Sequence, residues 1–219
     1  MSLDNCPPAP PLEDLGLMEP MPGSEPFNAA AWVFALPTPG YRMLAEIGPE
    51  TGATRRGVRL RSRRGVDATR RFSEVARALA ALRVARTVVD GEVCVLDAAG
   101  RSDLQSLHAR ALHPGHRPGT SPVVMSLRDV LVWEARDVRG LPWRERQQLL
   151  QSLPLQAGAA LRLERTVRAE GHWLFRQALA LGSEAIHAHR ADAPYEAGRS
   201  LVWLSIPVPT ATQTQSLAA

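Results

Sequence analysis

The chain has 219 residues, of which 45% are hydrophobic and 22% are charged, and its formal net charge is +4. This composition is typical of a soluble globular protein with a sizeable core, and no apolar run approaches the roughly 18 residues of a membrane-spanning helix. The start of the chain lacks the pattern of a signal peptide, and two distant cysteines, Cys6 and Cys94, do not make a disulfide framework. We therefore expect a cytoplasmic protein without a membrane partner.

The two ends of the chain are predicted to pack poorly. Residues 1–26 are rich in Pro, Gly and acidic side chains, which is typical of a flexible leader. Residues 208–219 form a polar segment that we expect to be a disordered tail. The region between them, residues 27–207, is expected to fold as one domain.

The first part of this region alternates short strands with one helix. Trp32–Leu36 and Tyr41–Ile47 flank a Pro-Gly turn and are predicted to form a hairpin. Gly57–Ser62 alternates as a further strand, and Arg71–Leu82 carries apolar residues at helical spacing. Cys94 lies in an apolar run and is expected to be a small core residue.

Strands and helices continue to alternate irregularly to the end of this region. Two helices are predicted to begin beside good capping or first-turn residues: one after Ser102 or Asp103, and one after Pro142. The predicted elements are strands at Thr87–Asp97, Val123–Val132, Glu184–His189 and Leu201–Ile206, and helices at Asp103–Ala111, Trp143–Leu153 and Gly171–Leu181. This order indicates an α+β fold of antiparallel sheets with flanking helices.

Positive charge is concentrated between Arg55 and Arg71, where the chain holds eight arginines. Such a run can follow the phosphates of a nucleic acid, and it is equally typical of a solvated hairpin. The candidate DNA-binding residues are Arg55, Arg56, Arg59, Arg61, Arg63, Arg64, Arg70 and Arg71.

Other candidate sites have weaker patterns. His187 and His189 alternate along one predicted strand and should point to the same face. His113 and His116 lie in a Pro/Gly-rich loop without a nearby Cys or acidic residue, so we expect no metal site. The tryptophans are expected to lie in the core; they are Trp32, Trp133, Trp143, Trp173 and Trp203.

Five stretches of the chain follow one known set of motifs in order and spacing. The stretch from Trp32 fits W-x-F-E-x-K-x-D-G-x-R at Trp32, Phe34, Gly40, Tyr41 and Arg42. The stretch from Leu60 fits S-R-x-G-x-D-x-T-x-R-F-P-E-V at Ser62, Arg63, Gly65, Asp67, Thr69, Arg71, Phe72, Glu74 and Val75.

The remaining three stretches lie in the second half of the pattern. One is the D-G-E motif at Asp90, Gly91 and Glu92. The next fits F-D-L-L-x-L-D-G-x-D-L-R at Asp129, Leu131, Asp137 and Arg139. The last fits E-G-I-V-A-K-R and Y-x-x-G-R-S…W-L-K-x-K at Glu184, Arg190, Tyr195, Gly198, Arg199, Ser200, Trp203 and Leu204.

Over roughly residues 17–207 the chain thus resembles the adenylation (nucleotidyltransferase) domain of ATP-dependent DNA ligases, and most of all the ligase module of bacterial end-joining ligases. The resemblance implies an ATP-grasp-like nucleotidyltransferase fold, ATP and Mg²⁺ as the family's cofactors, nicked DNA as a partner, and a place in DNA repair or recombination. Residues at the family's nucleotide-binding positions are Arg42, Arg63, Glu92, Arg128 and Glu184.

The chain departs from this family at its reactive positions. The family's nucleophile is a lysine, and its slot is Pro37, which has no side-chain nucleophile. All 26 basic residues are arginine, so no lysine can replace it, and arginine is a poor nucleophile. Three further positions at which the family has lysine are occupied by His189, Ser205 and Pro207. Arg128 occupies the position of the family's aromatic residue that stacks on adenine. The match also ends where the family's oligonucleotide-binding (OB) domain would follow.

Three hypotheses follow from this combination. The first is a non-catalytic module that keeps the fold and binds DNA or a partner in repair. The second is an enzyme with residual or unusual ligase or ATP-binding activity, acting with a partner chain. The third is a structural interaction protein, for example for another repair protein, that touches no nucleic acid.

Overall fold

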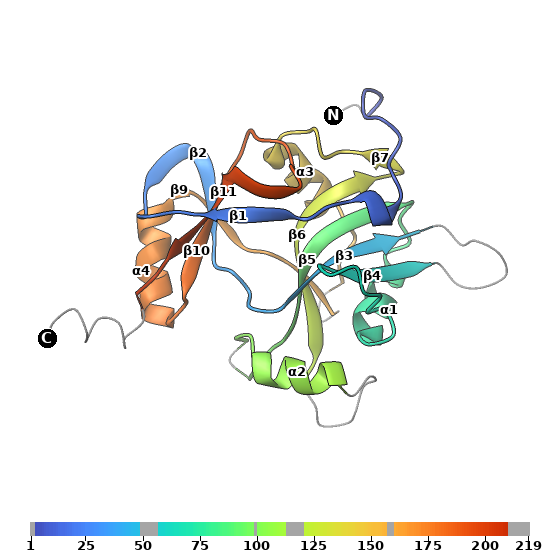
Figure 1. Cartoon of the computed structure of the whole chain (residues 1–219), viewed down its shortest axis with the longest axis horizontal. Helices are drawn as coiled ribbons and strands as arrows, with labels where there is room; N and C mark the ends of the chain where they lie inside the picture. The colour runs from blue at the N-terminus through green and yellow to red at the C-terminus, as the bar shows by residue number, and fades with distance from the viewer. Residues whose placement is uncertain (1–2, 49–56, 99, 113–120, 157–159, 210–219) are drawn as a thin grey trace, which may run out of the picture. The chain divides into compact units, whose positions relative to one another are not determined.

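The chain folds into two compact units, each built around one sheet. The computed structural model describes residues 3–48, 57–98, 100–112, 121–156 and 160–209 (Figure 1). Unit 1 comprises Met1–Leu17, Thr38–Leu141 and Glu145–Leu163, and unit 2 comprises Met18–Pro37, Pro142–Arg144 and Glu164–Ala219. No helix among the described residues is long and apolar enough to cross a membrane.

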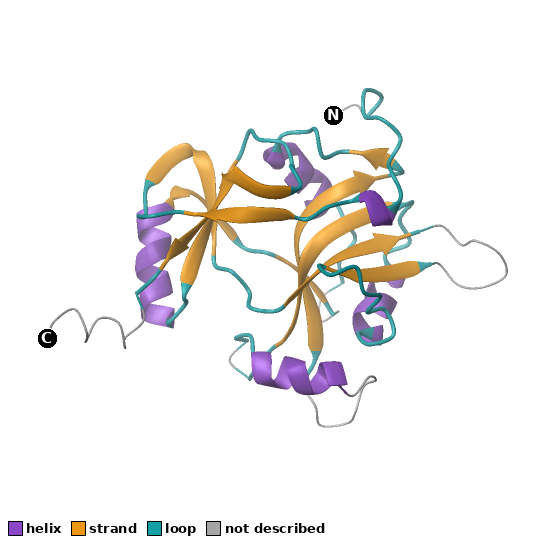
Figure 2. Ribbon diagram, viewed as in Figure 1, coloured by secondary structure: helices purple, strands orange, loops and turns teal. Residues whose placement is uncertain are grey.

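Unit 1 contains a six-stranded sheet in the order β4-β3-β5-β6-β7, with β8 paired to β6 (Figure 2). Its strands are β3 (Tyr41–Ile47), β4 (Val58–Ser62), β5 (Thr87–Val95), β6 (Val123–Trp133), β7 (Arg136–Asp137) and β8 (Leu161–Leu163). Its helices are α1 (Ser73–Ala81) and α2 (Leu104–Leu112), and most of α3 (Trp143–Gln151) also belongs to it.

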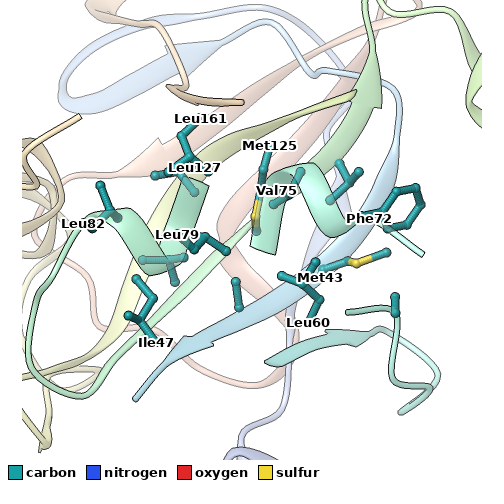
Figure 3. Close-up of a cluster of buried hydrophobic side chains, with 14 of the residues drawn as sticks. Met43, Ile47, Leu60, Phe72, Val75, Leu79, Leu82, Met125, Leu127 and Leu161 are labelled. Atoms are coloured by element: carbon teal, nitrogen blue, oxygen red, sulfur yellow. The ribbon is translucent and has the colours of Figure 1, made fainter. Parts of the chain in front are cut away.

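Helix α1 supplies one side of the main core of unit 1 (Figure 3). The predicted apolar positions Phe72, Val75, Leu79 and Leu82 are all buried, which confirms the helical periodicity of this segment. They pack with one face of the sheet, where Met43, Leu60, Val89 and Leu127 are among their neighbours in the same buried cluster. Helix α2 begins as predicted after Asp103, whose Oδ1 accepts a hydrogen bond from the Ser106 backbone N–H.

The segment predicted to be a flexible leader is packed against unit 1. Residues 3–17, which we call the N-terminal strap, bury Cys6, Leu12 and Leu15. The backbone of the strap bonds to the β6–β7 turn, with Ala9 N–H donating to Ala135 O and Asp137 N–H donating to Pro7 O. The polar and Pro-rich composition of the strap predicts a flexible segment, but a few apolar side chains are enough to pack it.

Unit 2 contains a five-stranded sheet in the order β1-β11-β10-β2-β9. Its strands are β1 (Met18–Pro22), β2 (Asn28–Ala35), β9 (Thr166–Glu170), β10 (Ala185–Arg190) and β11 (Gly198–Pro207), and α4 (Gly171–Leu181) covers it. Leu174 and Ala178 of α4 pack on Phe34, Ile186 and Ile206 in a second core.

Residues from both chain ends that were predicted to pack poorly belong to the folded part of unit 2. Met18 starts β1, which pairs in parallel with β11, so residues 18–22 belong to a sheet. Val208, the first residue of the predicted tail, is buried in the core of unit 2, and its N–H donates to Glu184 O. Residues 210–219 lie outside the described part of the chain.

The predicted hairpin of Trp32–Leu36 and Tyr41–Ile47 is wrong. β2 pairs with β10 and β9 in unit 2, whereas β3 pairs with β4 and β5 in unit 1. The connection contains Pro37 and Pro39, which have no N–H to donate to a ladder. β2 instead finds partners that are distant in sequence, which local turn signals do not reveal.

The α+β fold class is confirmed, although the sheets are mixed. Two edge pairings, β1 with β11 and β6 with β8, are parallel. The other predicted strands and all four predicted helices form within a few residues of their expected bounds. Within the described residues, four strands were not predicted, namely β1, β7, β8 and β9, which have five residues or fewer. Cys6 and Cys94 are both buried and free, as expected for Cys94.

Candidate functional site

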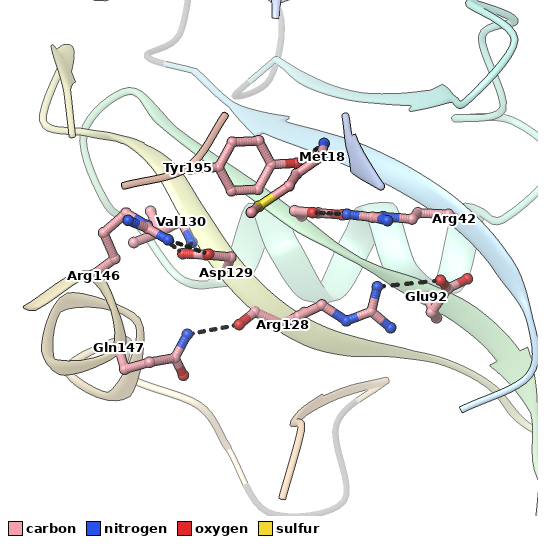
Figure 4. Close-up of polar contacts among 10 residues, drawn as sticks. Met18, Arg42, Glu92, Arg128, Asp129, Val130, Arg146, Gln147 and Tyr195 are labelled. Carbon is pink, nitrogen blue, oxygen red and sulfur yellow. Dashed lines mark hydrogen bonds and ion pairs between the residues drawn. The ribbon is translucent and has the colours of Figure 1, made fainter. Parts of the chain in front are cut away.

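The candidate site lies on the face of the six-stranded sheet that is turned away from α1. Alternate residues of a strand point to opposite faces, and Met43, Val89 and Val93 point into the α1 core. Arg42 pairs with Glu92 and Leu44 pairs with Asp90 across β3 and β5. The side chains of Arg42, Asp90 and Glu92 therefore share the other face, and Figure 4 shows Arg42 and Glu92 on it.

Arg42 and Asp90 form a two-point ion pair on this face. The Arg42 Nε donates to Asp90 Oδ1 at 2.9 Å, and its Nη2 donates to Asp90 Oδ2 at 2.5 Å. The Asp90 side chain is 0% exposed and that of Arg42 is 11% exposed. A planar guanidinium held by two parallel hydrogen bonds has little freedom to turn toward another group.

A β-bulge in β6 adds two further polar side chains to the same face. Gly91 pairs with Leu127, but the preceding Asp90 pairs with Asp129, so Arg128 is an extra residue on β6. The side chain of Arg128 is 3% exposed, and its Nη1 lies 3.5 Å from Glu92 Oε1. Gln147 of α3 donates through Nε2 to the Arg128 carbonyl at 2.7 Å, which satisfies the backbone of the bulge.

Asp129, beside the bulge, is held by a buried arginine. Arg146 of α3 donates through Nε to Asp129 Oδ1 at 2.9 Å and through Nη2 to Asp129 Oδ2 at 2.8 Å. The Val130 N–H donates to the same Oδ1. Burial raises the pKa of Asp129, and the attraction of Arg146 opposes this increase.

The roles of Asp129, Arg146 and Gln147 at the site were not predicted from the sequence. A signal for the bulge was present, because Arg128 and Asp129 are two consecutive polar residues inside an 11-residue strand whose other members are mostly apolar. Two neighbours can both face away from a core only where the alternation of the strand is interrupted. The partner Arg146 comes from another element, and no local pattern identifies it.

The close approach of two strands explains why the D-G-E motif has glycine at its second position. A Cβ at Gly91 would lie 2.4 Å from Ser126 O on β6 and 3.1 Å from the Met125 methyl carbon. β5 and β6 therefore approach each other at this point in a way that excludes any side chain. Gly40, just before β3, is similar, since a Cβ there would lie 2.5 Å from Val93 O.

The structure brings together three of the five predicted nucleotide-binding residues. Arg42, Glu92 and Arg128 share the polar face of unit 1. Arg63 follows β4 and is exposed, and its N–H donates to Arg42 O at 3.2 Å. Glu184 belongs to unit 2, where it is exposed just before β10.

The predicted common face of His187 and His189 is confirmed in unit 2. The ring of His189 stacks on Trp143 at 6.0 Å and on Trp203 at 4.9 Å, with interplanar angles of 19° in both cases. His187 meets Trp203 edge-on at 5.3 Å. His189, in the slot of a family lysine, is thus a buried member of an aromatic stack.

The prediction that the tryptophans lie in the core holds for only some of them. Trp143 and Trp203 are buried. Trp32 and Trp133 are partly buried and pack against the cores of their units. Trp173 is 44% exposed on α4, so the prediction is wrong for this residue.

The predicted DNA-binding arginines divide into two groups. Arg59 Nη2 donates to Glu13 Oε1 of the strap at 2.6 Å, and Arg61 donates to the Leu15 carbonyl. Exposed arginines lie in and after the turn that follows β4; they are Arg63, Arg64, Arg70 and Arg71. The turn folds back on β4 through a bridge between Arg61 and Asp67, so the segment has the form of a hairpin. Arg55 and Arg56 lie outside the described residues.

Metal-binding geometry does not occur in the described ranges, where no group of three or more His, Cys, Asp or Glu residues could hold an ion. His113 and His116 are outside these ranges. Cys94 is unsuited to nucleophilic chemistry, because burial raises the pKa of its thiol to about 11. Arg162, whose Nη2 lies 4.0 Å from Cys94 Sγ, only partly opposes this effect.

Comparisons with known proteins agree with the motif order. The family model described as ATP dependent DNA ligase domain matches residues 40–206. The multifunctional non-homologous end joining protein LigD of Pseudomonas aeruginosa is 32% identical over 176 residues, which are 80% of this chain and 20% of LigD. The chain therefore spans about a fifth of the length of this relative.

Solved structures give the same result. A mycobacterial DNA ligase D complexed with ATP and MES superposes with a TM-score of 0.72 at 27% identity, covering 90% of this chain and 61% of that one. The ligase domain of M. tuberculosis LigD superposes with a TM-score of 0.71 at 26% identity, covering 89% and 60%.

Proposed function

Because the chain belongs to the ATP dependent DNA ligase domain family, we propose that it is a non-catalytic member that binds DNA in a repair context and does not adenylate itself. Its relatives include LigD proteins, whose name states a role in non-homologous end joining. Pro37 occupies the position of the family's nucleophilic lysine, and the sequence contains no lysine at all. A lysyl-AMP intermediate therefore has no atom on which to form.

The observation that carries this proposal is the ion pair between Arg128 and Glu92. By resemblance to the family, Arg128 occupies the position that stacks on adenine, and Glu92 occupies the position that helps to hold the nucleotide ribose or a metal. In this chain their side chains face each other, 3% and 13% exposed, with 3.5 Å between Nη1 and Oε1. Binding a nucleotide in the family's manner would require this buried pair to separate, which carries a large desolvation penalty.

The changes at the other lysine positions support the same conclusion. The family's phosphate contacts are cationic, whereas this chain has Ser205 and Pro207 at two of those positions. His189, at a third lysine position, is stacked between Trp143 and Trp203. Cationic groups that contact the transferred phosphates are central to phosphoryl transfer, so several such groups would have to return together for catalysis.

A direct test is incubation with α-labelled ATP and Mg²⁺, followed by detection of label on the protein under both acidic and basic conditions. We expect no adduct, with an active ATP-dependent ligase labelled in parallel as the positive control. Label that remains on the protein through denaturation would contradict the non-catalytic assignment. It would favour the alternative of unusual ligase activity.

DNA binding is proposed to use the exposed arginines that follow β4. The partner is duplex DNA, with a nicked duplex carrying a 5′-phosphate as the preferred form. The triple variant Arg64→Glu/Arg70→Glu/Arg71→Glu should abolish binding, because each residue offers a phosphate contact. The matched control reverses three exposed arginines elsewhere, namely Arg83, Arg165 and Arg176.

Binding should be measured across a salt series on nicked and intact duplexes. Affinity should fall steeply with salt, by about 0.9 log units per log unit of salt for each phosphate contact. Equal weakening by both triple variants would indicate only a net-charge effect. Absence of binding by the wild type and by every variant tested would favour the interaction-protein hypothesis.

A further inference from the structure

The N-terminal strap places the carboxylate of Glu13 beside the arginines of β4. Arg59 and Arg61 are two residues apart on β4, so their side chains leave the same face of the sheet. Glu13 Oε1 accepts a hydrogen bond from Arg59 Nη2 at 2.6 Å, and the Leu15 carbonyl accepts one from Arg61. The strap therefore engages these two arginines through a side chain and a backbone group.

Glu13 is held at this position by its neighbours in the strap. Leu12 and Leu15 on either side of it are each 1% exposed, and the residues between them form a short 3-10 helix, Leu12–Asp14. Farther along the strap, Arg86 donates through Nη1 to Ala9 O and through Nη2 to Pro10 O. The backbone of Glu13 is consequently held in place by its neighbours, and its side chain reaches Arg59 from there.

The Glu13–Arg59 pair itself remains open to solvent. The two side chains are 56% and 50% exposed, respectively, and exposed ion pairs of this kind are weak. The hydrogen bond and charge of Arg59 lower the pKa of Glu13, so the carboxylate is ionised at neutral pH. A tethered anion beside an arginine acts as a competitor at high local concentration.

We propose that Glu13 is a built-in competitor of DNA phosphate, which masks Arg59 and limits the affinity of this surface for duplex DNA. The inference rests on the proposed DNA binding and adds a regulatory contact to it. Duplex DNA carries about one charge per 1.7 Å of its axis, so a phosphate that reaches Arg59 must displace a single carboxylate. Removing that carboxylate therefore makes Arg59 available as one more phosphate contact.

The test compares two neighbouring substitutions that change the net charge equally. Glu13→Gln should tighten duplex binding about two- to fivefold at low salt and steepen the log–log salt slope by about 0.9. Asp14→Asn is the control, since Asp14 is exposed and enters no ion pair within the described part of the chain. It should leave the salt slope unchanged.

A double-mutant cycle separates masking from general charge. Arg59→Gln alone should leave the affinity of the wild-type protein nearly unchanged, and in the Glu13→Gln background it should remove the whole gain. Thermal unfolding of each variant checks that the strap stays packed. Identical effects of Glu13→Gln and Asp14→Asn, or an equal loss from Arg59→Gln in both backgrounds, would overturn the inference while leaving DNA binding intact.

Wild-type protein that does not bind, with a Glu13→Gln variant that does, would support masking in its complete form. Binding by neither protein would reject both the proposed DNA binding and the masking contact.

Discussion

At the scale of single residues, Arg128 connects the sequence change to a structural consequence. A guanidinium is planar and can stack on a base, but that of Arg128 is buried and faces the carboxylate of Glu92. The substitution therefore introduces a charge into a sheet face that already holds the Arg42–Asp90 and Arg146–Asp129 pairs. The charges on this face are paired with one another, so removing one partner would leave an uncompensated buried charge.

Restoring the nucleophile alone is expected to be insufficient. The variant Pro37→Lys should form no labelled adduct with α-labelled ATP, because the Arg128–Glu92 pair and the missing phosphate-binding lysines remain. Adding Arg128→Phe should permit weak ATP binding, measurable by calorimetry, before any chemistry appears. Robust self-adenylation of Pro37→Lys would show that the nucleotide-binding residues are functional as they stand.

The buried pair of Asp129 and Arg146 gives a prediction with a defined pH dependence. Arg146→Ala should lower the free energy of unfolding by about 3–5 kcal/mol, because it leaves a buried carboxylate without its counter-ion. The folded-state pKa of Asp129 is raised above its unfolded value. The folded state therefore keeps a proton that the unfolded chain releases, and stability falls as the pH rises through that window.

Because Arg146 lowers the pKa of Asp129, its removal raises that pKa further, and the loss caused by Arg146→Ala should be smaller at pH 5 than at pH 8, as measured by urea denaturation. The control is Asp129→Asn/Arg146→Met, which removes both charges and should show little change between these two pH values at this site. A deficit of Arg146→Ala that does not vary with pH would mean that Asp129 is solvated by other groups.

At the scale of elements, the helices were predictable and the strand partners were not. Periodicity identified α4 with its observed bounds, Gly171–Leu181, because one apolar stripe of a helix is a local property. The partner of β2 was mispredicted, since it lies more than a hundred residues away in β10. The sequence does carry a signal for the β6 bulge, in the consecutive polar residues Arg128 and Asp129, but the β5 and α3 residues that meet the bulge lie in other elements.

A glycine at the start of α4 provides a test at this scale. Gly171→Ala should destabilise the protein by about 2 kcal/mol through overpacking, although alanine has the better helix propensity by about 1 kcal/mol. A Cβ at this position would lie 2.1 Å from Phe27 O and 2.6 Å from the Phe34 ring. The measurement is the midpoint of thermal unfolding.

Gly140→Ala is the matched control for this substitution, because a Cβ there meets nothing within 4 Å. It should leave the midpoint nearly unchanged. A neutral or stabilising Gly171→Ala variant would indicate that the start of α4 can shift away from Phe27 without cost.

At the scale of the whole molecule, the amino-acid composition gave a wrong prediction for the N-terminal segment. The proline and acid content of residues 1–26 suggested a leader, but three apolar residues in it, Leu12, Leu15 and Met18, are buried. The sequence motifs did identify the family and the fold class. The division into two units, and the residues that each unit takes from both chain ends, depended on long-range packing that motifs do not describe.

The packing of the strap predicts a measurable contribution to stability. Leu12→Ala and Leu15→Ala should each lower the free energy of unfolding by about 2–5 kcal/mol, as expected for buried leucines. Asp14→Asn, in the same segment but exposed, should have an effect within about 0.5 kcal/mol. Losses below about 1 kcal/mol for both leucine variants would return the strap to the status of a loosely attached leader.

The two thiols of this chain offer a way to time its motions. Cys6 is buried within the strap and Cys94 within β5, and the sequence contains no other cysteine. A thiol reagent can modify each one only when its surroundings open. The labelling rate of Cys6 therefore reports how often the strap opens, and that of Cys94 reports how often the central sheet opens. A labelling rate that is higher for Cys6 than for Cys94 would mean that the strap opens while the sheet stays closed.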